Sequence, residues 1–221
     1  MLPTKIYILH HTPLKERKGH LKRALEKQGI VVEWVEGFKP EEIKEKYEEY
    51  LKGHEIFYDT TIHHPYGKYK NFSKKININE LSLYLKYKYC FEQQSEHNYE
   101  TILILEDDVI IPSNINEYLN NNTLEFLNTD GDILVMGESH HFRVQNKNGK
   151  YIHHHPKNKT RCAHAILYKL KCNSKILDTI NIINLPIDFK LNEIMQKENL
   201  KVYWSDPGLK QNKNYKTSVQ I

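Results

Sequence analysis

The stretch Thr101-Ile-Leu-Ile-Leu-Glu106-Asp107-Asp108-Val109 joins a run of large apolar residues to three adjacent carboxylates. Four of the five residues before Glu106 are Ile or Leu, a composition typical of a central strand that is covered on both faces. Side chains that follow such a strand lie at the carboxyl edge of the sheet, where open α/β folds place their ligand sites. The stretch therefore predicts an α/β fold with a polar site at the end of this strand.

The carboxylates of Glu106, Asp107 and Asp108 repel one another, and a divalent cation is the usual way to relieve such repulsion. Carboxylate oxygens suit Mg²⁺ or Mn²⁺, and these ions normally hold a substrate diphosphate as well. The triplet accordingly favours a metal-dependent enzyme that acts on a nucleotide-linked substrate. An acidic turn that only ends a strand is the alternative, because surface carboxylates are common.

The length of 221 residues is sufficient for a full hydrophobic core, and neither a linker nor an internal repeat divides the chain. We expect one domain over residues 1–208, followed by a polar carboxyl-terminal tail at 209–221. A run of about 18 apolar residues does not occur, so a membrane span is not expected. The amino terminus has no long apolar segment of the signal-peptide type, and the predicted location is cytoplasmic.

The formal net charge is +4, and the basic residues are spread among Glu residues along the predicted helices. This pattern indicates solvated helix faces rather than a stripe that binds nucleic acid. Cys90, Cys162 and Cys172 are odd in number and lack metal-type spacing, which indicates reduced thiols.

The order of apolar and amphipathic segments predicts alternating strands and helices. Residues 5–9 and 30–35 have the composition of strands, and an amphipathic helix predicted at 14–28 connects them. A right-handed crossover makes two such strands parallel neighbours. The expected fold is a mostly parallel central sheet flanked by helices. Further helices are predicted at 40–51, 77–96, 114–128, 173–183 and 187–198, and further strands at 132–136, 163–169 and 200–204.

Two segments lack a clear periodicity. Residues 53–75 are rich in aromatic residues and histidine, and we interpret them as a loop or excursion. Residues 140–160 are polar, and a hairpin turn is predicted at Asn148-Gly149. The run His153-His154-His155 is interpreted as an exposed loop, because adjacent residues of an extended chain point to opposite sides and chelate one ion poorly.

Three blocks of sequence follow one another in an order that carries a family resemblance. They comprise Lys5-Ile-Tyr-Ile-Leu9 with Arg17 and Val35-Glu36-Gly37; Glu80-Leu81-Ser82 with Ile104-Leu105-Glu106-Asp107-Asp108-Val109; and Ala163-His164-Ala165 with Leu185-Pro186-Ile187-Asp188, Val202-Tyr203 and Asp206-Pro207. In this order they resemble glycosyltransferase family 25, whose members act in lipopolysaccharide synthesis and as collagen galactosyltransferases. The resemblance covers nearly the whole chain and implies a single GT-A-like, Rossmann-like domain.

The chain departs from the family pattern at two places. The family usually has a Ser-His pair late in the helix before the acidic strand, where this chain has Lys86-Tyr87. The family's opening loop typically carries Asn-Leu-Asp, where this chain has His10-His11-Thr12. Both departures bear on the identity of the donor and on activity.

The resemblance implies a particular reaction and a role for each residue of the triplet. A sugar, galactose or glucose, would pass with inversion from a nucleotide-sugar donor, expected to be UDP-linked, to a hydroxyl of a glycan or glycoprotein. Mn²⁺ or Mg²⁺ is expected at the triplet, with Asp108 as a direct ligand and Glu106 facing the ribose or a metal-bound water. Asp107 is also counted among the donor-binding residues, although a continuing strand would point it the other way.

His164 and Asp188 each have two interpretations. His164 is a candidate further metal ligand, or it is a histidine packed beside the sheet. Asp188 is a candidate general base, or it is the N-cap of the helix that follows. Its place in the family pattern favours the base.

Three residues at strand ends and at a helix start are candidates for donor binding. Arg17 suits bidentate recognition of the donor phosphates, or it is an exposed arginine at the start of a helix. His10 follows the first strand and Glu36 follows the second, and both positions lie on the nucleotide side of the fold that the resemblance implies.

Two other functions remain open on the sequence alone. A nucleotidyltransferase also needs carboxylates and a cation, but it usually has a glycine-rich basic loop near the first strand, and residues 10–19 contain one glycine. A non-catalytic scaffold that binds carbohydrate is compatible with Lys86-Tyr87. The intact acidic triplet and Asp188 argue against this scaffold.

Overall fold

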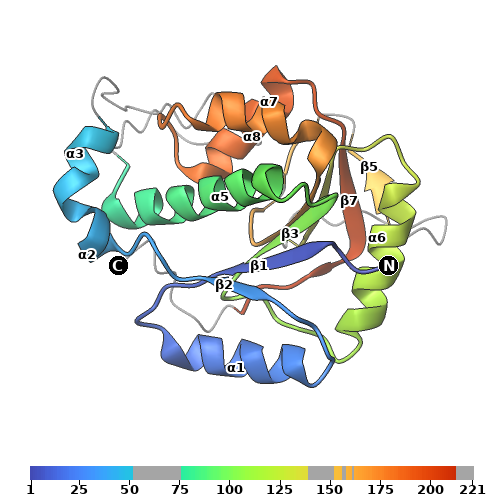
Figure 1. Cartoon of the computed structure of the whole chain (residues 1–221). Helices are drawn as coiled ribbons and strands as arrows, with labels where there is room; N and C mark the ends of the chain where they lie inside the picture. Colours follow the sequence, from blue (N-terminus) through green and yellow to red (C-terminus); the bar gives the residue numbers. More distant parts are fainter. Residues whose placement is uncertain (52–75, 139–151, 156–157, 161, 213–221) are drawn as a thin grey trace, which may run out of the picture.

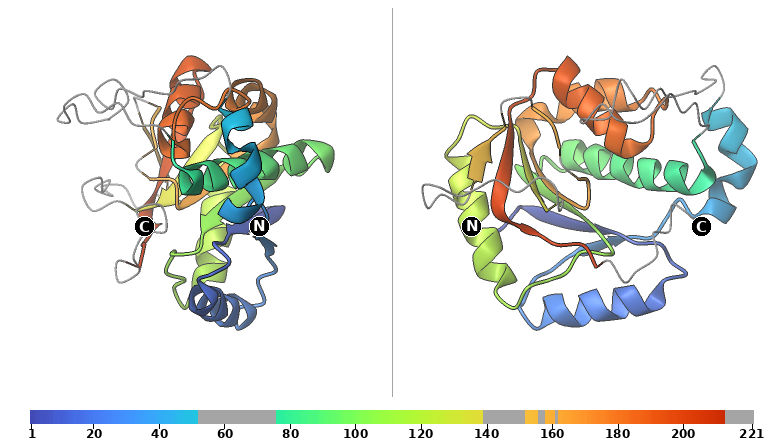
Figure 2. Two further views of the ribbon diagram at one scale, coloured as in Figure 1. Left: turned by 90° about the vertical axis from the view of Figure 1, so that its left-hand side faces the viewer. Right: turned by 180° about the vertical axis from the view of Figure 1, so that it is seen from behind.

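A computed structural model of the chain describes residues 1–51, 76–138, 152–155, 158–160 and 162–212. In this part of the chain a seven-stranded sheet forms the middle layer, and helices pack on both of its faces (Figure 1). Figure 2 shows the same layers from the side and from behind. The predicted α/β class is confirmed.

The sheet has the strand order β2-β1-β3-β6-β4-β7-β5. Among the described strands, β5 and β6 run opposite to the other five, so that the sheet is mixed. The predicted mostly parallel sheet is confirmed in that most of the described strands run in one direction. It is wrong for the neighbours of β6, because β6 lies between β3 and β4 and pairs with both in an antiparallel arrangement. The strands comprise β1 (Lys5–Leu9), β2 (Glu33–Val35), β3 (Thr101–Glu106), β4 (Ile133–Gly137), β5 (Ile152–His154), β6 (Ala165–Lys169) and β7 (Val202–Leu209).

The helices divide between the two faces of the sheet. Helices α1 and α6 contribute to one apolar core, whereas α5, α7 and α8 contribute to the other (Figure 1). Among the described helices, none combines the length and the apolar character that crossing a bilayer requires. The helices comprise α1 (Lys15–Glu26), α2 (Pro40–Ile43), α3 (Tyr47–Tyr50), α5 (Ile78–Glu96), α6 (Ile115–Leu127), α7 (Asn173–Ile180) and α8 (Ile187–Lys197), with 3₁₀ turns η1 (Lys44–Lys46) and η2 (Leu170–Cys172).

Strand β3 is apolar from Ile102 to Leu105 because both of its faces are buried there. Ile102 and Ile104 belong to the core under α5, α7 and α8, whereas Leu103 and Leu105 belong to the core under α1 and α6. All four side chains are at most 2 % exposed. The alternation of side chains along a strand thus distributes one apolar run over two cores.

The predicted strand–helix–strand opening is confirmed as β1-α1-β2. The two strands are parallel, with Tyr7 opposite Glu33 and Leu9 opposite Val35. Helix α1 buries Leu21 and Leu25 against the sheet. This unit places the residues that follow β1 and β2 at the same edge of the sheet.

Helix α5 begins where the sequence provides a reciprocal cap. The Asn77 side chain accepts a hydrogen bond from the Glu80 backbone N–H (2.9 Å), and the Glu80 carboxylate accepts one from the Asn77 N–H (2.8 Å). These bonds satisfy two backbone donors that the first helical turn leaves without an internal partner. The cap fixes the start of α5, and one face of this helix lines the cavity described below.

Two expectations need correction, and two others are not tested. The helix predicted at 40–51 is divided into α2, η1 and α3. The strand predicted at 200–204 continues to Leu209, beyond the domain boundary expected at residue 208. The hairpin turn predicted at Asn148-Gly149 and the loop predicted at 53–75 lie outside the described residues.

The histidine run is also different from its prediction. Ile152–His154 form strand β5, which pairs with β7 in an antiparallel arrangement. His155 stacks on Trp204, with the two ring centroids 4.2 Å apart. Pairing with β7 and stacking on its aromatic side chains give this segment a strand conformation that its polar sequence did not indicate.

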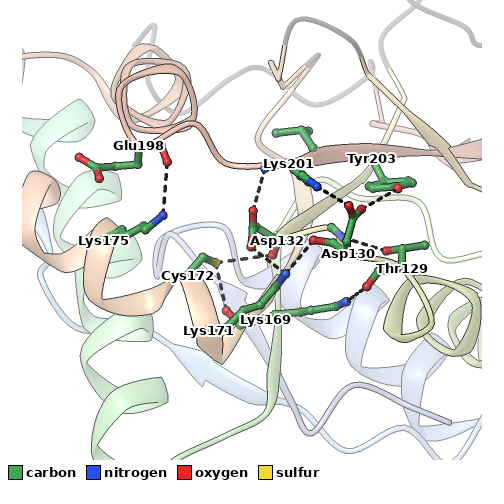
Figure 3. Close-up of polar contacts among 12 residues, drawn as sticks. Thr129, Asp130, Asp132, Lys169, Lys171, Cys172, Lys175, Glu198, Lys201 and Tyr203 are labelled. Carbon is green, nitrogen blue, oxygen red and sulfur yellow. Dashed lines mark hydrogen bonds and ion pairs between the residues drawn. The ribbon is translucent and has the colours of Figure 1, made fainter.

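A polar cluster holds the amino-terminal ends of β4 and β7 and the end of β6 together (Figure 3). Lys171 forms an ion pair with Asp132 (3.0 Å), and the Lys201 backbone N–H donates to the same carboxylate (2.8 Å). The Lys169 ammonium donates to the carbonyl oxygen of Thr129 (2.9 Å). Because β6 is antiparallel to β4 and β4 is parallel to β7, this cluster lies at the amino edge of the sheet, opposite the ends of β1 and β3.

Gly137 lies where β4 closely approaches two side chains. A Cβ atom at this position would lie 2.5 Å from Cys162 Sγ and 2.7 Å from His164 Nε2. We expect Gly137→Ala to lower the free energy of unfolding by about 1–3 kcal/mol, the usual cost of overpacking. Chemical denaturation measures this change. Gly37→Ala is the control, because a Cβ there would have no atom within 4 Å, and an equal loss in both variants would contradict the expectation.

Candidate active site

A cavity of about 260 Å³ lies at the carboxyl edge of the sheet. Residues that follow β1 and β3, one face of α5, and the first turn of α8 form its walls. The lining residues are Leu9, His10, His11, Arg17, Asn79, Ser82, Leu83, Lys86, Glu106, Asp107, Asp108, Asp188 and Gln211.

The acidic triplet forms the turn at the end of β3, as the sequence predicts. The strand ends at Glu106, and Asp107 and Asp108 form the turn that follows it. All three residues line the cavity. The chain leaves the strand after Glu106, and therefore the three carboxylates do not simply alternate between the faces of the sheet.

Asp107 is the buried member of the triplet. Its carboxylate accepts hydrogen bonds from His10 Nδ1 (2.8 Å), from the His11 backbone N–H (3.0 Å) and from Arg17 Nη1 (2.8 Å). Burial alone would raise the pKa of Asp107, but these three donors and the charge of Arg17 hold the pKa below its usual value. Asp107 thus binds the loop after β1 and helix α1 to the end of β3.

Arg17 and His10 therefore lie in the site but are bonded to protein. Arg17 is 5 % exposed, so the interpretation of an exposed arginine at a helix start is wrong. His10 is also buried, and its ring lies edge-on to Trp34 with the centroids 5.8 Å apart. Both residues line the cavity and orient the acidic turn.

Glu106 and Asp108 are half-buried and lack the strong donor set of Asp107. Burial, followed by the negative charges of Asp108, Asp188 and Asp107, raises the pKa of Glu106 well above its usual value. Burial and Asp107 likewise raise the pKa of Asp108, whereas Arg17 and Gln211 act in the opposite direction. The cavity thus concentrates negative charge on these two carboxylates.

Asp188 lies in the first turn of α8 and lines the same cavity. The N-cap of α8 is Pro186, so Asp188 is not the N-cap. Asp188 is exposed, and the protein atoms packed around its carboxylate, followed by the charges of Glu80 and Asp108, raise its pKa to about 6. A carboxylate with this pKa takes up and releases a proton near neutral pH.

One face of α5 forms another wall of the cavity and was not predicted as part of the site. Asn79, Ser82, Leu83 and Lys86 follow the spacing of one helix face and line the cavity. Lys86 is 3 % exposed, and its ammonium donates to the His10 carbonyl oxygen (2.7 Å). The signal that the sequence offered was the departure from the family pattern at Lys86-Tyr87.

Glu36 and His164 are absent from the lining of this cavity. Glu36 forms an ion pair with Lys18, and the hydrogen bond from Lys18 lowers the pKa of Glu36 below its usual value. His164 is 1 % exposed, and its Nε2 donates to the Leu209 carbonyl oxygen (2.9 Å). The structure therefore brings Glu106, Asp107, Asp108, Asp188, His10 and Arg17 together but not these two.

The segment after β7 holds the outer side of the acidic turn. The Asn212 N–H donates to the Asp108 carbonyl oxygen (2.7 Å), and the Ile110 N–H donates to the Lys210 carbonyl oxygen (2.8 Å). The Gln211 side chain reaches the Asp108 carboxylate at 3.3 Å. Residues 210–212, which were predicted to belong to a tail, are part of the site.

The donor set of the cavity fits a hard divalent cation that is shared with a substrate. In the described part of the chain, no group of three or more His, Cys, Asp or Glu side chains has the arrangement of a complete metal site. Mg²⁺ and Mn²⁺ often take only one or two protein carboxylates and receive their remaining ligands from phosphate oxygens and water. Glu106 and Asp108 match this requirement, and Asp107 does not, because its oxygens are bonded to His10, His11 and Arg17.

These features define an α/β protein with an acidic cavity at the carboxyl edge of its sheet. The family model described as glycosyltransferase family 25 (LPS biosynthesis protein) matches residues 4–189. This match covers most of the chain, which therefore belongs to glycosyltransferase family 25 and has a glycosyltransferase activity. The resemblance drawn from the sequence is confirmed. No curated protein in the comparison matches the chain.

Proposed function

We propose that the protein transfers a hexose, galactose or glucose, from a UDP-linked donor to a hydroxyl of a glycan or glycoprotein, with inversion at the anomeric carbon. The observation that supports this reaction is the position of Glu106, Asp108 and Asp188 on the walls of one cavity. Two of these carboxylates suit a cation, and the third suits a base. Membership of the family supplies the reaction class, a donor and an acceptor.

Asp108 and Glu106 are the residues that would hold the cation. Mn²⁺ or Mg²⁺ bound there would supply Lewis-acid stabilisation of the diphosphate leaving group. Burial, followed by the negative charges of neighbouring carboxylates, raises the pKa values of both residues, and a nearby positive charge would favour the ionised form of both. Asp107, held by Arg17 and His10, keeps the turn in a fixed orientation.

Asp188 is the proposed base. Its carboxylate takes the proton of the acceptor hydroxyl while the hydroxyl oxygen bonds to the anomeric carbon of the sugar. The bond from that carbon to the diphosphate oxygen breaks in the same displacement, and the nucleoside diphosphate leaves. One displacement inverts the configuration at the anomeric carbon, so that an α-linked donor yields a β-linkage.

A donor panel tests the proposal directly. Binding and hydrolysis of UDP-, GDP- and CMP-sugars are measured with Mn²⁺ and with EDTA, for the wild type and for Asp108→Asn. We expect one UDP-hexose to bind in a Mn²⁺-dependent manner, and we expect Asp108→Asn to lose the effect of Mn²⁺. Asp178→Asn, a change at an exposed carboxylate of α7, is the control.

The other outcomes of this panel lead to different conclusions. A folded wild-type protein that ignores every donor and Mn²⁺ would contradict the proposal and favour a carbohydrate-binding scaffold. Mn²⁺-dependent turnover of a GDP- or CMP-sugar would keep the transferase mechanism and replace the UDP-linked donor.

A further inference from the structure

Lys86 introduces a buried positive charge into the acidic cavity. Its side chain comes from α5, on the wall that faces the end of β1, and its ammonium donates to the His10 carbonyl oxygen (2.7 Å). An ammonium carries three N–H groups, and a single backbone carbonyl uses one of them. The side chain is 3 % exposed, so a solvated surface role does not explain it.

The charges that line the cavity are unequal. Four carboxylates line the cavity, those of Glu106, Asp107, Asp108 and Asp188. The lining residues include two strongly basic side chains, Arg17 and Lys86. Arg17 is paired with Asp107 at 2.8 Å. Lys86 is therefore the cation of the lining that does not form an ion pair with a carboxylate in the described part of the chain.

Burial makes the ammonium of Lys86 costly. It lowers the pKa of Lys86, and the negative charges of Asp107, Glu36, Glu42 and Glu41 oppose this change. An anion that enters the cavity would give the ammonium a direct partner and would restore charge-assisted hydrogen bonds. The chemistry of the site calls for such an anion, since a glycosyl donor carries phosphate groups.

Carboxylates alone would repel a diphosphate. Glu106 and Asp108 would hold a cation whose charge would balance part of the charge of a diphosphate, and the second phosphate group would still carry negative charge. Lys86 stands on the α5 wall, and the two carboxylates come from the end of β3. The two positive charges would thus reach the diphosphate from different walls of the same cavity.

On the basis of the proposed function, we propose that Lys86 binds the diphosphate of the donor and selects nucleoside diphosphate sugars over nucleoside monophosphate sugars. In this role Lys86 touches substrate, and its bond to the His10 carbonyl positions the ammonium. Its contribution is separate from that of the divalent cation, so a part of the affinity for diphosphate persists in EDTA and depends on Lys86.

Inorganic pyrophosphate is the probe, because its binding does not depend on the base or the sugar of the donor. Calorimetric titrations with and without Mg²⁺ compare the wild type with Lys86→Met, Lys86→Gln and Lys86→Arg. We expect Lys86→Met and Lys86→Gln to bind pyrophosphate about 10- to 100-fold more weakly, the range for a lost hydrogen bond to a charged group. Lys86→Arg should retain most of the affinity, because it keeps the charge.

Two controls separate charge from structure. Lys86→Gln offers a neutral N–H to the His10 carbonyl, so a purely structural tether would be largely restored in it. Lys88→Met changes a half-exposed lysine of the same helix that pairs with Glu92 (3.6 Å). Thermal unfolding of each variant verifies that the protein is folded at the titration temperature.

Wild-type affinity for pyrophosphate in Lys86→Met or Lys86→Gln would overturn the inference, as would a wild-type protein that does not bind pyrophosphate. The proposed function fails separately. A protein that binds pyrophosphate through Lys86 but turns over no sugar nucleotide would retain this inference and lose the transferase proposal. Equal turnover of a UDP-hexose by the wild type and by Lys86→Met would retain the transferase proposal and overturn this inference.

Discussion

Asp188→Asn is expected to lower the rate of sugar transfer by about 10²- to 10⁴-fold, the usual contribution of a positioned general base. Asn occupies the same space but cannot accept a proton from the acceptor hydroxyl. Asp188 is not the N-cap of α8, and its side chain faces the cavity, so the folded structure should persist. The measurement is single-turnover transfer at saturating donor, together with the affinity for the donor, which should change little.

The pH dependence of the same reaction gives an independent test of Asp188. The base acts when it is ionised, and its pKa is raised to about 6. The rate should therefore increase with pH and level off above this pKa, and a cation held by Asp108 would shift the midpoint downward. Asp188→Asn should lose this rising limb. An unchanged rate in Asp188→Asn, or a wild-type rate that falls across this range, would assign the proton transfer to another group.

Asp107→Asn is expected to lower the free energy of unfolding by about 3–5 kcal/mol, the cost of removing one partner of a buried ion pair. The Arg17 guanidinium, 5 % exposed, would remain buried and would lose its ion pair with Asp107. The Asn side chain also has one oxygen in place of two, and its NH₂ group cannot accept a hydrogen bond. Some of the N–H groups that now bond to the Asp107 carboxylate, among them those of His10 and His11, would therefore lose their acceptor. Denaturant unfolding at pH 7 measures the loss.

The sign of the pH effect follows from the lowered pKa of Asp107. Its carboxylate stabilises the folded protein above the pKa of an unfolded aspartate, about 3.9, and the contribution disappears as pH falls through the lower folded value. The difference between wild type and Asp107→Asn should thus be constant near neutral pH and shrink below about pH 4.

The Asp130–Lys201 pair provides the matched control for Asp107. Both of its side chains are at least half exposed, and it belongs to the cluster in Figure 3 at the amino edge of the sheet. Asp130→Asn should change stability little, because solvent screens an exposed pair. Equal losses in the two variants would show that burial of Asp107 is not the cause.

The sequence predicted those parts of the fold that depend on local pattern. The apolar run of β3 has the length and composition of a buried strand. The β1-α1-β2 unit follows from the periodicity of its apolar residues and from the right-handed crossover. The antiparallel position of β6 was not predicted, because an apolar strand has the same alternation in either direction. Strand β5 was missed because its pairing with β7 outweighs its polar composition.

The candidate site was predicted in part for the same reason. Adjacency in the sequence placed Glu106, Asp107 and Asp108 together, but it did not divide their roles. Asp107 differs from its neighbours because Arg17, 90 residues away in the sequence, donates to its carboxylate. A hydrogen bond between residues so far apart in the sequence depends on the tertiary structure and cannot be predicted from local pattern. His10, by contrast, was predicted from its position after β1.

Position along the chain alone does not show which residues line the cavity, as three residues illustrate: Lys86, Glu36 and His164. Lys86 was noticed as a departure from the family pattern, and the structure places it in the cavity wall. Glu36 follows β2 as expected, yet Lys18 holds its carboxylate outside the lining. His164 lies beside the sheet, where the Leu209 carbonyl engages its ring.

The contact between the segment after β7 and the acidic turn sets a limit on truncation. The family match ends at residue 189, but β7 pairs with both β4 and β5, and the Asn212 N–H is bonded to the Asp108 carbonyl oxygen. A fragment trimmed to the matched range would expose one edge of β4 and release one side of the turn that carries Asp108. The shortest autonomous catalytic unit of this chain therefore extends at least to Asn212.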